Sequence, residues 1–182
     1  MSPGWSIACP PPNRRSRPSL QRKSGACSPR RTTTVWHLAL SGLRRGEIGG
    51  LRWSDIDFDQ GEWGVLRIAN NMVPVEGGSE EGEPKTAGSC RTLPLTRSLH
   101  DALEKARLIQ ATEKLALGDN YGPGTHVVCN ETGRSYHPDT LYDLWVAMCR
   151  MAGVRRIRLH DARHTCGTLM HLQGVPIAVI AA

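Results

Sequence analysis

The sequence has no apolar run that approaches the roughly eighteen residues of a membrane span, and its N-terminus has no clean hydrophobic core for export. Its six cysteines are scattered singly, without a C-x-x-C pair. These absences exclude a helix that crosses a membrane and a disulfide-stapled secreted domain. We therefore expect a cytoplasmic protein with no membrane partner, in which the thiols are reduced and mostly serve packing.

Acidic residues are fewer than basic ones. The chain has 23 Lys and Arg against 17 Asp and Glu, a formal charge of +6 in 182 residues. This excess favours a polyanion such as nucleic acid as the partner, although a solvated basic surface would give the same totals. The length suits one domain plus a tail.

Residues 1–31 are rich in Pro, Ser and Arg and show neither helical nor strand periodicity. Such a segment buries too little apolar surface to offset its chain entropy, so we expect it to be disordered, either as a basic arm on DNA phosphates or as a linker. The composition changes at Thr32, and we assign residues 32–182 to one domain.

Apolar periodicity, caps and turn residues predict an α+β domain that is mainly helical and has a small antiparallel sheet. Helices are expected near residues 32–43, 44–48, 97–117, 139–152, 160–173 and 176–182, and strands within 53–68, 90–95 and 126–129. A long Gly/Glu loop is expected between the second strand and residue 90. Thr96 is predicted to cap the helix that starts at residue 97.

His160 and Arg163 stand three residues apart on a predicted helix, so they share one face. A guanidinium fork beside an imidazole suits a phosphoryl group, whose oxygens need fixed donors. Two other interpretations remain open. His160 caps the helix while Arg163 pairs with Asp161 or Asp139, or else His160, Asp161 and His164 bind a metal ion.

Three ordered motifs give a more specific signal. They are LSGLRRGEIGGLRWSDID at residues 40–57, PKTAGSCRTLPL at residues 84–95 and RLHDARHT at residues 158–165. Together they resemble the tyrosine recombinase (phage integrase) family, and the resemblance covers about residues 34–182. It implies a helical catalytic domain with a small antiparallel β-sheet, acting on double-stranded DNA.

The resemblance also implies a reaction and its residues. In the family a tyrosine attacks the scissile phosphodiester, leaving a 3′-phosphotyrosyl link and a free 5′-hydroxyl, with no metal or cofactor. Arg44 and Arg163 match the two arginines that grip the phosphate, and Lys85 matches the general acid for the leaving oxygen. His160 matches the histidine that assists proton transfer, and Glu47 matches a supporting acidic residue.

The nucleophile departs from the family pattern. The family places its tyrosine downstream of the H-x-x-R helix, whereas Tyr121, Tyr136 and Tyr142 all precede Arg163. We assign no nucleophile, and we expect a catalytic domain truncated at its C-terminus.

Site-specific recombination or integration is thus the leading functional hypothesis, with this chain an incomplete form that binds DNA, as one copy or as a homo-oligomer, without cutting it. No small-molecule substrate is expected. A non-catalytic DNA-binding or regulatory module is the alternative, and a metal-dependent hydrolase is a further one.

Overall fold

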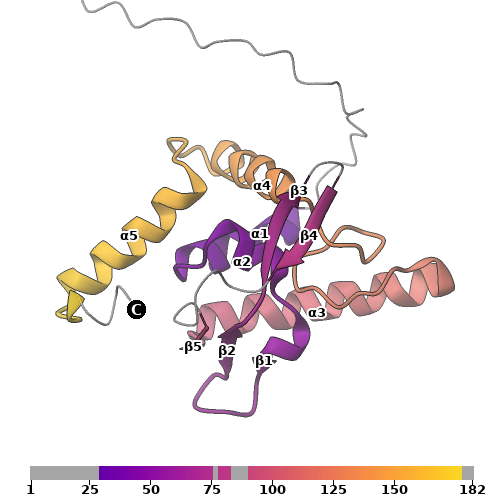
Figure 1. Cartoon of the computed structure of the whole chain (residues 1–182), viewed down its shortest axis with the longest axis horizontal. Coiled ribbons are helices and arrows are strands. Elements are labelled where there is room, and N and C mark those ends of the chain that lie inside the picture. The colour runs from indigo at the N-terminus through magenta and orange to yellow at the C-terminus, as the bar shows by residue number, and fades with distance from the viewer. Residues whose placement is uncertain (1–28, 76–77, 83–89, 178–182) are drawn as a thin grey trace, which may run out of the picture.

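A computed structural model describes residues 29–75, 78–82 and 90–177, and it is mainly helical with small antiparallel sheets, as predicted (Figure 1). The helices are α1 (Pro29–Leu40), α2 (Arg45–Gly50), α3 (Arg97–Leu117), α4 (Pro138–Met151) and α5 (Leu159–Leu172), with single 3-10 turns at Trp53–Asp55 and Gly118–Asn120. The strands are β1 (Ile56–Asp57), β2 (Val65–Ile68), β3 (Asn71–Val75), β4 (Gly78–Gly82) and β5 (Arg91–Pro94).

The core is built around α1, which contacts α2, α3, α4 and α5. Leu38 of α1 and Leu103 of α3 are both fully buried. Trp36 stacks on the fully buried Trp145 of α4, with ring centroids 4.5 Å apart and planes 17° apart. α1 is therefore the helix against which the other four pack.

One antiparallel sheet has the strand order β1-β2-β5. Leu66 of β2 pairs with Leu93 of β5, and Ile68 pairs with Arg91. Leu66 and Ile68 are buried in the core. This register places Arg91 at the start of β5, next to a buried strand.

The expected Gly/Glu loop is wrong for residues 71–75 and 78–82, because β3 and β4 pair there as antiparallel strands, here called the hairpin, in which Met72 pairs with Glu81. Side chains from other parts of the chain contact this hairpin. Glu81 forms an ion pair with Arg52, and its Oε1 lies 2.7 Å from Nε2 of the buried His126. A Cβ added at Gly46 of α2 would lie 2.8 Å from the carbonyl oxygen of Met72, so only glycine permits this close packing of α2 on β3.

The predicted strand at residues 126–129 is also wrong. His126 and Cys129 form isolated bridges, to Arg52 and Ser135 respectively, and no ladder extends between them. Thr96 caps α3 as predicted, accepting a hydrogen bond from the Leu99 N–H at 3.3 Å. The bounds predicted for α4 and α5 are correct to within one residue.

The first helix begins earlier than predicted, at Pro29 rather than after a threonine cap near Thr32. Residues 1–28 of the predicted N-terminal segment lie outside the described residues, as do residues 178–182 of the last predicted helix. At the other end, α5 extends away from the body of the molecule (Figure 1), and Leu169 and Leu172 on its second half are 55% and 76% exposed. No helix within the described ranges is long and apolar enough to cross a membrane.

Candidate phosphate-binding site

Arg44 lies at the junction of α1 and α2, as the sequence predicts. Gly42 has a φ of +87°, a left-handed conformation that suits glycine and turns the chain after α1. Arg44 then precedes α2, and its backbone N–H donates to Glu47 Oε2 at 2.7 Å while its Nη1 donates to Glu47 Oε1 at 2.9 Å. The Arg44 side chain stays 50% exposed, so Glu47 orients it without covering it.

Glu47 also binds a second arginine. Arg91 of β5 donates from Nη1 to Oε1 at 3.0 Å and from Nη2 to Oε2 at 2.9 Å, a bidentate pair. The side chains of Glu47 and Arg91 are only 6% and 16% exposed. Burial by itself would raise the pKa of Glu47, but hydrogen bonds from Arg91 and Arg44 lower it below its ordinary value. Glu47 is therefore a charged, buried carboxylate that fixes two guanidinium groups.

Arg163 of α5 lies beside the turn that carries Arg44. Leu159 and Ala162 are buried and hold the first half of α5 against the body. Arg163 Nη1 donates to the carbonyl oxygen of Gly42. Burial lowers the pKa of Arg163, the positive charges of Arg44 and Arg91 lower it further, and Glu47 opposes them.

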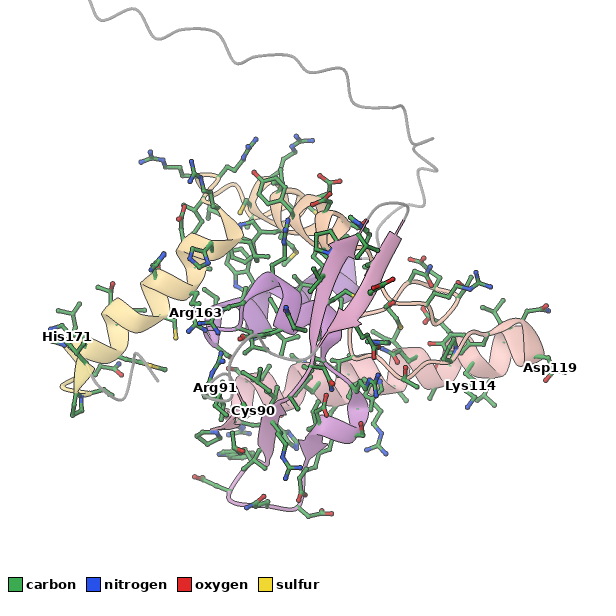
Figure 2. The ribbon with its side chains drawn as sticks, in the orientation of Figure 1. Cys90, Arg91, Lys114, Asp119, Arg163 and His171 are labelled. Carbon is green, nitrogen blue, oxygen red and sulfur yellow. The ribbon has the colours of Figure 1, made fainter. Side chains whose placement is uncertain are left out.

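Arg44, Arg91 and Arg163 thus form an arginine cluster, in which two guanidinium groups hydrogen-bond the Glu47 carboxylate and the third lies near enough for its charge to interact with theirs. Figure 2 shows Arg163 and Arg91 at the edge of the body from which α5 extends. The cluster keeps an excess of positive charge in a partly desolvated setting, where Coulomb interactions are stronger than in bulk water. Such a site can bind a phosphate and stabilise charge that develops on its oxygens.

The other predicted site residues are placed differently. His160 is exposed at the start of α5, and its ring meets that of His164 edge-on at 4.6 Å. Lys85 lies in residues 83–89, outside the described residues. Arg45, expected to be a solvated neighbour of Arg44, is exposed and pairs with Asp139 at 3.1 Å.

Two alternatives from the sequence are wrong. His160 does not cap α5, because the helix begins at Leu159 and the residue in the cap position is Arg158. Arg163 donates to Gly42 rather than to Asp161 or Asp139. Within residues 29–75, 78–82 and 90–177, no three His, Cys, Asp or Glu side chains gather closely enough to hold a metal ion.

Arg91 was missed as a site residue. In the sequence it marked only the start of an R-x-x-P-L strand, and its partner Glu47 is 44 residues away. Glu47 is the sequence signal that could have led to Arg91. A carboxylate inside an apolar helical turn needs buried cationic partners, and one half-exposed Arg44 does not satisfy it.

Comparisons with known proteins identify the family of this chain. Residues 20–182 match the sequence model described as "Phage integrase family". A "Tyrosine recombinase XerC-like" protein of Caldanaerobacter subterraneus subsp. tengcongensis is 33% identical over 153 residues, covering 78% of this chain and 38% of the relative. "Prophage integrase IntR" of Escherichia coli K12 is 28% identical over 165 residues, covering 81% of this chain and 38% of that protein. The chain therefore spans less than half the length of these curated relatives.

Solved structures share the fold. An integrase of the Tn1549 transposon, in complex with circular intermediate DNA, superposes with a TM-score of 0.64 at 17% identity, over 81% of this chain and 49% of that one. The XerA recombinase gives a TM-score of 0.59 at 17% identity, over 84% of this chain and 48% of that one. The motifs, the fold and the match over most of the chain together show that this protein belongs to the phage integrase family of tyrosine recombinases.

Proposed function

We propose that this chain supplies the phosphate-gripping part of a site for site-specific DNA recombination, and that it binds double-stranded DNA through the arginine cluster. The observation that carries the proposal is the excess of guanidinium groups over carboxylates around Glu47. The bidentate pair with Arg91 already gives each oxygen of Glu47 a donor. Here Arg44 remains half-exposed beside that pair, and Arg163 adds a third positive charge.

In this proposal Arg44 and Arg163 contact the two non-bridging oxygens of the scissile phosphate. Their donors face the charge that builds up in the pentacoordinate transition state, and they lower its free energy more than that of the ground state. Arg91 is a positioning residue, because its fork is already occupied by Glu47. Glu47 fixes the guanidinium of Arg44 before DNA arrives, which reduces the entropy lost on binding.

His160 and Lys85 complete the proposed reaction by moving protons. The imidazole of His160 is exposed, and in this proposal it faces the bound backbone and assists proton transfer at the nucleophile. Lys85 protonates the leaving 5′-oxygen. Both roles rest on the family resemblance, and the reaction they serve is a transesterification that uses no metal ion.

We further propose that the 182-residue polypeptide binds DNA without cutting it. Guanidinium groups stabilise a transition state but cannot attack phosphorus. Two of the tyrosine hydroxyls are occupied elsewhere: Tyr142 accepts from Arg156 at 3.0 Å, and the Tyr121 hydroxyl lies 3.9 Å from the Cys129 sulfur. Tyr136 packs against the core. Association of several copies on DNA, in the cytoplasm, belongs to the same proposal.

The test is duplex binding at a series of salt concentrations, measured by fluorescence anisotropy. The native chain is expected to bind more weakly as salt rises, because phosphate contacts release counterions. Arg44→Gln is expected to reduce the slope of log K against log salt by about 1. Arg45→Gln is the matched control, since it removes the neighbouring charge, and its slope should stay near that of the native chain. Absence of salt-dependent binding by the native chain would overturn the proposal.

A second measurement addresses cleavage. The polypeptide is incubated with a nicked duplex and resolved under denaturing conditions, where no covalent protein-DNA band is expected. Such a band would contradict the proposal that the polypeptide binds without cutting. Supplying a tyrosine-bearing segment from a relative after residue 182 separates an incomplete recombinase, in which the band now forms, from a purely regulatory DNA-binding module, in which it does not.

A further inference from the structure

A second cationic feature lies between α4 and the start of α5, apart from the arginine cluster. It is an open hollow of about 360 Å³ lined by Tyr142, Arg155, Arg156, Ile157, Arg158 and Asp161, here called the basic hollow. We propose that the basic hollow binds the backbone of the same DNA duplex at a phosphate other than the scissile one. This inference rests on the proposed function and adds a contact surface to it.

The first argument is charge. Arg155, Arg156 and Arg158 are all exposed, and within the described part of the chain none of them forms an ion pair with a carboxylate. Asp161 is the one acidic residue of the lining, and its Oδ2 accepts a hydrogen bond from the backbone N–H of Arg158 at 3.0 Å. The hollow therefore offers several guanidinium groups whose donors are not satisfied by acids, which matches a polyanion.

The second argument is rigidity. The connection between α4 and α5 is tied down near its end, where Trp145 Nε1 donates to the carbonyl oxygen of Ile157 at 2.9 Å. At its start the Val154 N–H donates to the carbonyl oxygen of Cys149 at 3.1 Å, beside Gly153 with a φ of +65°. Because its backbone is fixed in this way, the segment loses little conformational entropy when a ligand binds.

The third argument distinguishes a duplex backbone from an unstacked base. Tyr142 is the one aromatic side chain of the lining, and Arg156 occupies it in two ways. Arg156 Nη2 donates to the Tyr142 hydroxyl at 3.0 Å, and its guanidinium carbon lies 5.9 Å from the ring centroid. A base that stacked on this ring would have to displace the guanidinium. The arrangement therefore favours phosphate oxygens, which Arg155 and Arg158 can bind while Arg156 stays in place.

The fourth argument is reach. Arg158 immediately precedes α5, and Arg163 lies five residues further along the chain, about 7.5 Å of helix rise away. One DNA strand carries a phosphate about every 3.4 Å along the helix axis. In this proposal, other phosphates of the same duplex meet the basic hollow when the scissile phosphate lies at Arg163. One rigid helix spaces the two contacts.

The test compares two triple variants that each remove three positive charges, using the full 182-residue chain and duplex DNA at several salt concentrations. Arg155→Gln with Arg156→Gln and Arg158→Gln removes the positive charges of the basic hollow. The matched control is Lys105→Gln with Arg107→Gln and Lys114→Gln, which neutralises three exposed cations on α3. The first variant is expected to reduce the salt slope by about 2 to 3 and the affinity at least tenfold, and the control by much less.

Each other outcome overturns something definite. Native-like binding by the first variant, or equal losses in both variants, overturns the basic hollow alone and leaves the arginine cluster standing. No binding by the native chain overturns both proposals. Equal affinity for a single-stranded oligonucleotide, lost in Tyr142→Ala, would show base stacking and overturn the assignment to a duplex backbone. Native-like circular dichroism and melting establish that each variant is folded, and single Arg→Gln variants replace any triple variant that is not.

Discussion

The two cationic regions of this molecule are held in different ways. In the arginine cluster a buried carboxylate receives hydrogen bonds from Arg44 and Arg91, so the Arg44 guanidinium that would meet DNA is held by a side chain of the folded interior. In the basic hollow the backbone is held by an indole N–H while the arginines stand in solvent. Positioning and stability are therefore coupled in the first region and separate in the second.

The largest effect is expected from removing the carboxylate of the arginine cluster. Glu47→Ala leaves the largely buried Arg91 without this partner, and breaking a buried pair in this way costs about 3–5 kcal/mol. The free energy of unfolding, measured with urea, should fall by that amount. Glu80→Ala on the exposed side of the hairpin is the control and should change little. A loss below about 1 kcal/mol for Glu47→Ala would show that the cluster is no better coupled to the interior than the basic hollow.

Low pH should also weaken the arginine cluster, by a smaller amount than Glu47→Ala does. The pKa of Glu47 is lowered in the folded state, so its contribution to stability is complete above the ordinary glutamate pKa of about 4.3 and is lost as the pH falls through the lower folded value. The stability difference between the native chain and Glu47→Gln should therefore shrink on acidification below about pH 4. A difference that stays constant down to pH 3 would contradict this assignment.

A smaller effect is expected where the basic hollow meets the core. Trp145→Phe removes the hydrogen bond to Ile157 and some buried volume, and should lower the free energy of unfolding by about 1–3 kcal/mol. Duplex affinity should fall with it, because the connection between α4 and α5 loses its anchor. Trp36→Phe shrinks the other ring of the stack but keeps the hydrogen bond, so it should affect stability more than affinity. Equal affinity losses in the two variants would contradict the anchoring role.

The smallest effect on stability is expected from the exposed arginines. Arg158→Gln should change the free energy of unfolding by less than about 0.5 kcal/mol, since the side chain is exposed and has no carboxylate partner among the described residues. Duplex binding of the same variant should still lose about one unit of salt slope. A stability loss comparable with that of Glu47→Ala would mean that the two regions are held in the same way.

The sequence predicted the helices well and the hairpin badly, for a physical reason. The helices α3, α4 and α5 have apolar residues at helical spacing and local stop signals such as Gly153 and Gly174. Strand β4 has the sequence GSEEG, whose residues have low strand propensity. Its conformation depends on pairing with β3 and on contacts of Glu81 with Arg52 and His126, which are distant in the sequence.

The site residues likewise divide into those that the sequence predicted and those that depend on distant contacts. Arg44, Glu47 and Arg163 lie near one another, and the family resemblance had already selected all three from distant motifs. Arg91 and the basic hollow carried no such signal. Arg91 is identified by a partner 44 residues away, and the hollow forms only because Tyr142 faces the segment before α5. Local sequence patterns do not show either of these contacts, because each joins residues that are separated along the chain.

The stacked indoles have a genetic consequence. Trp145 is fully buried and cannot touch DNA, yet it is stacked on α1, the helix that leads into Gly42 and Arg44, and it also holds the segment that carries Arg155 to Arg158. A selection for loss of DNA binding should therefore return changes at this hidden position alongside changes at the surface arginines. A map of such mutations drawn only from surface contacts would leave this one unexplained.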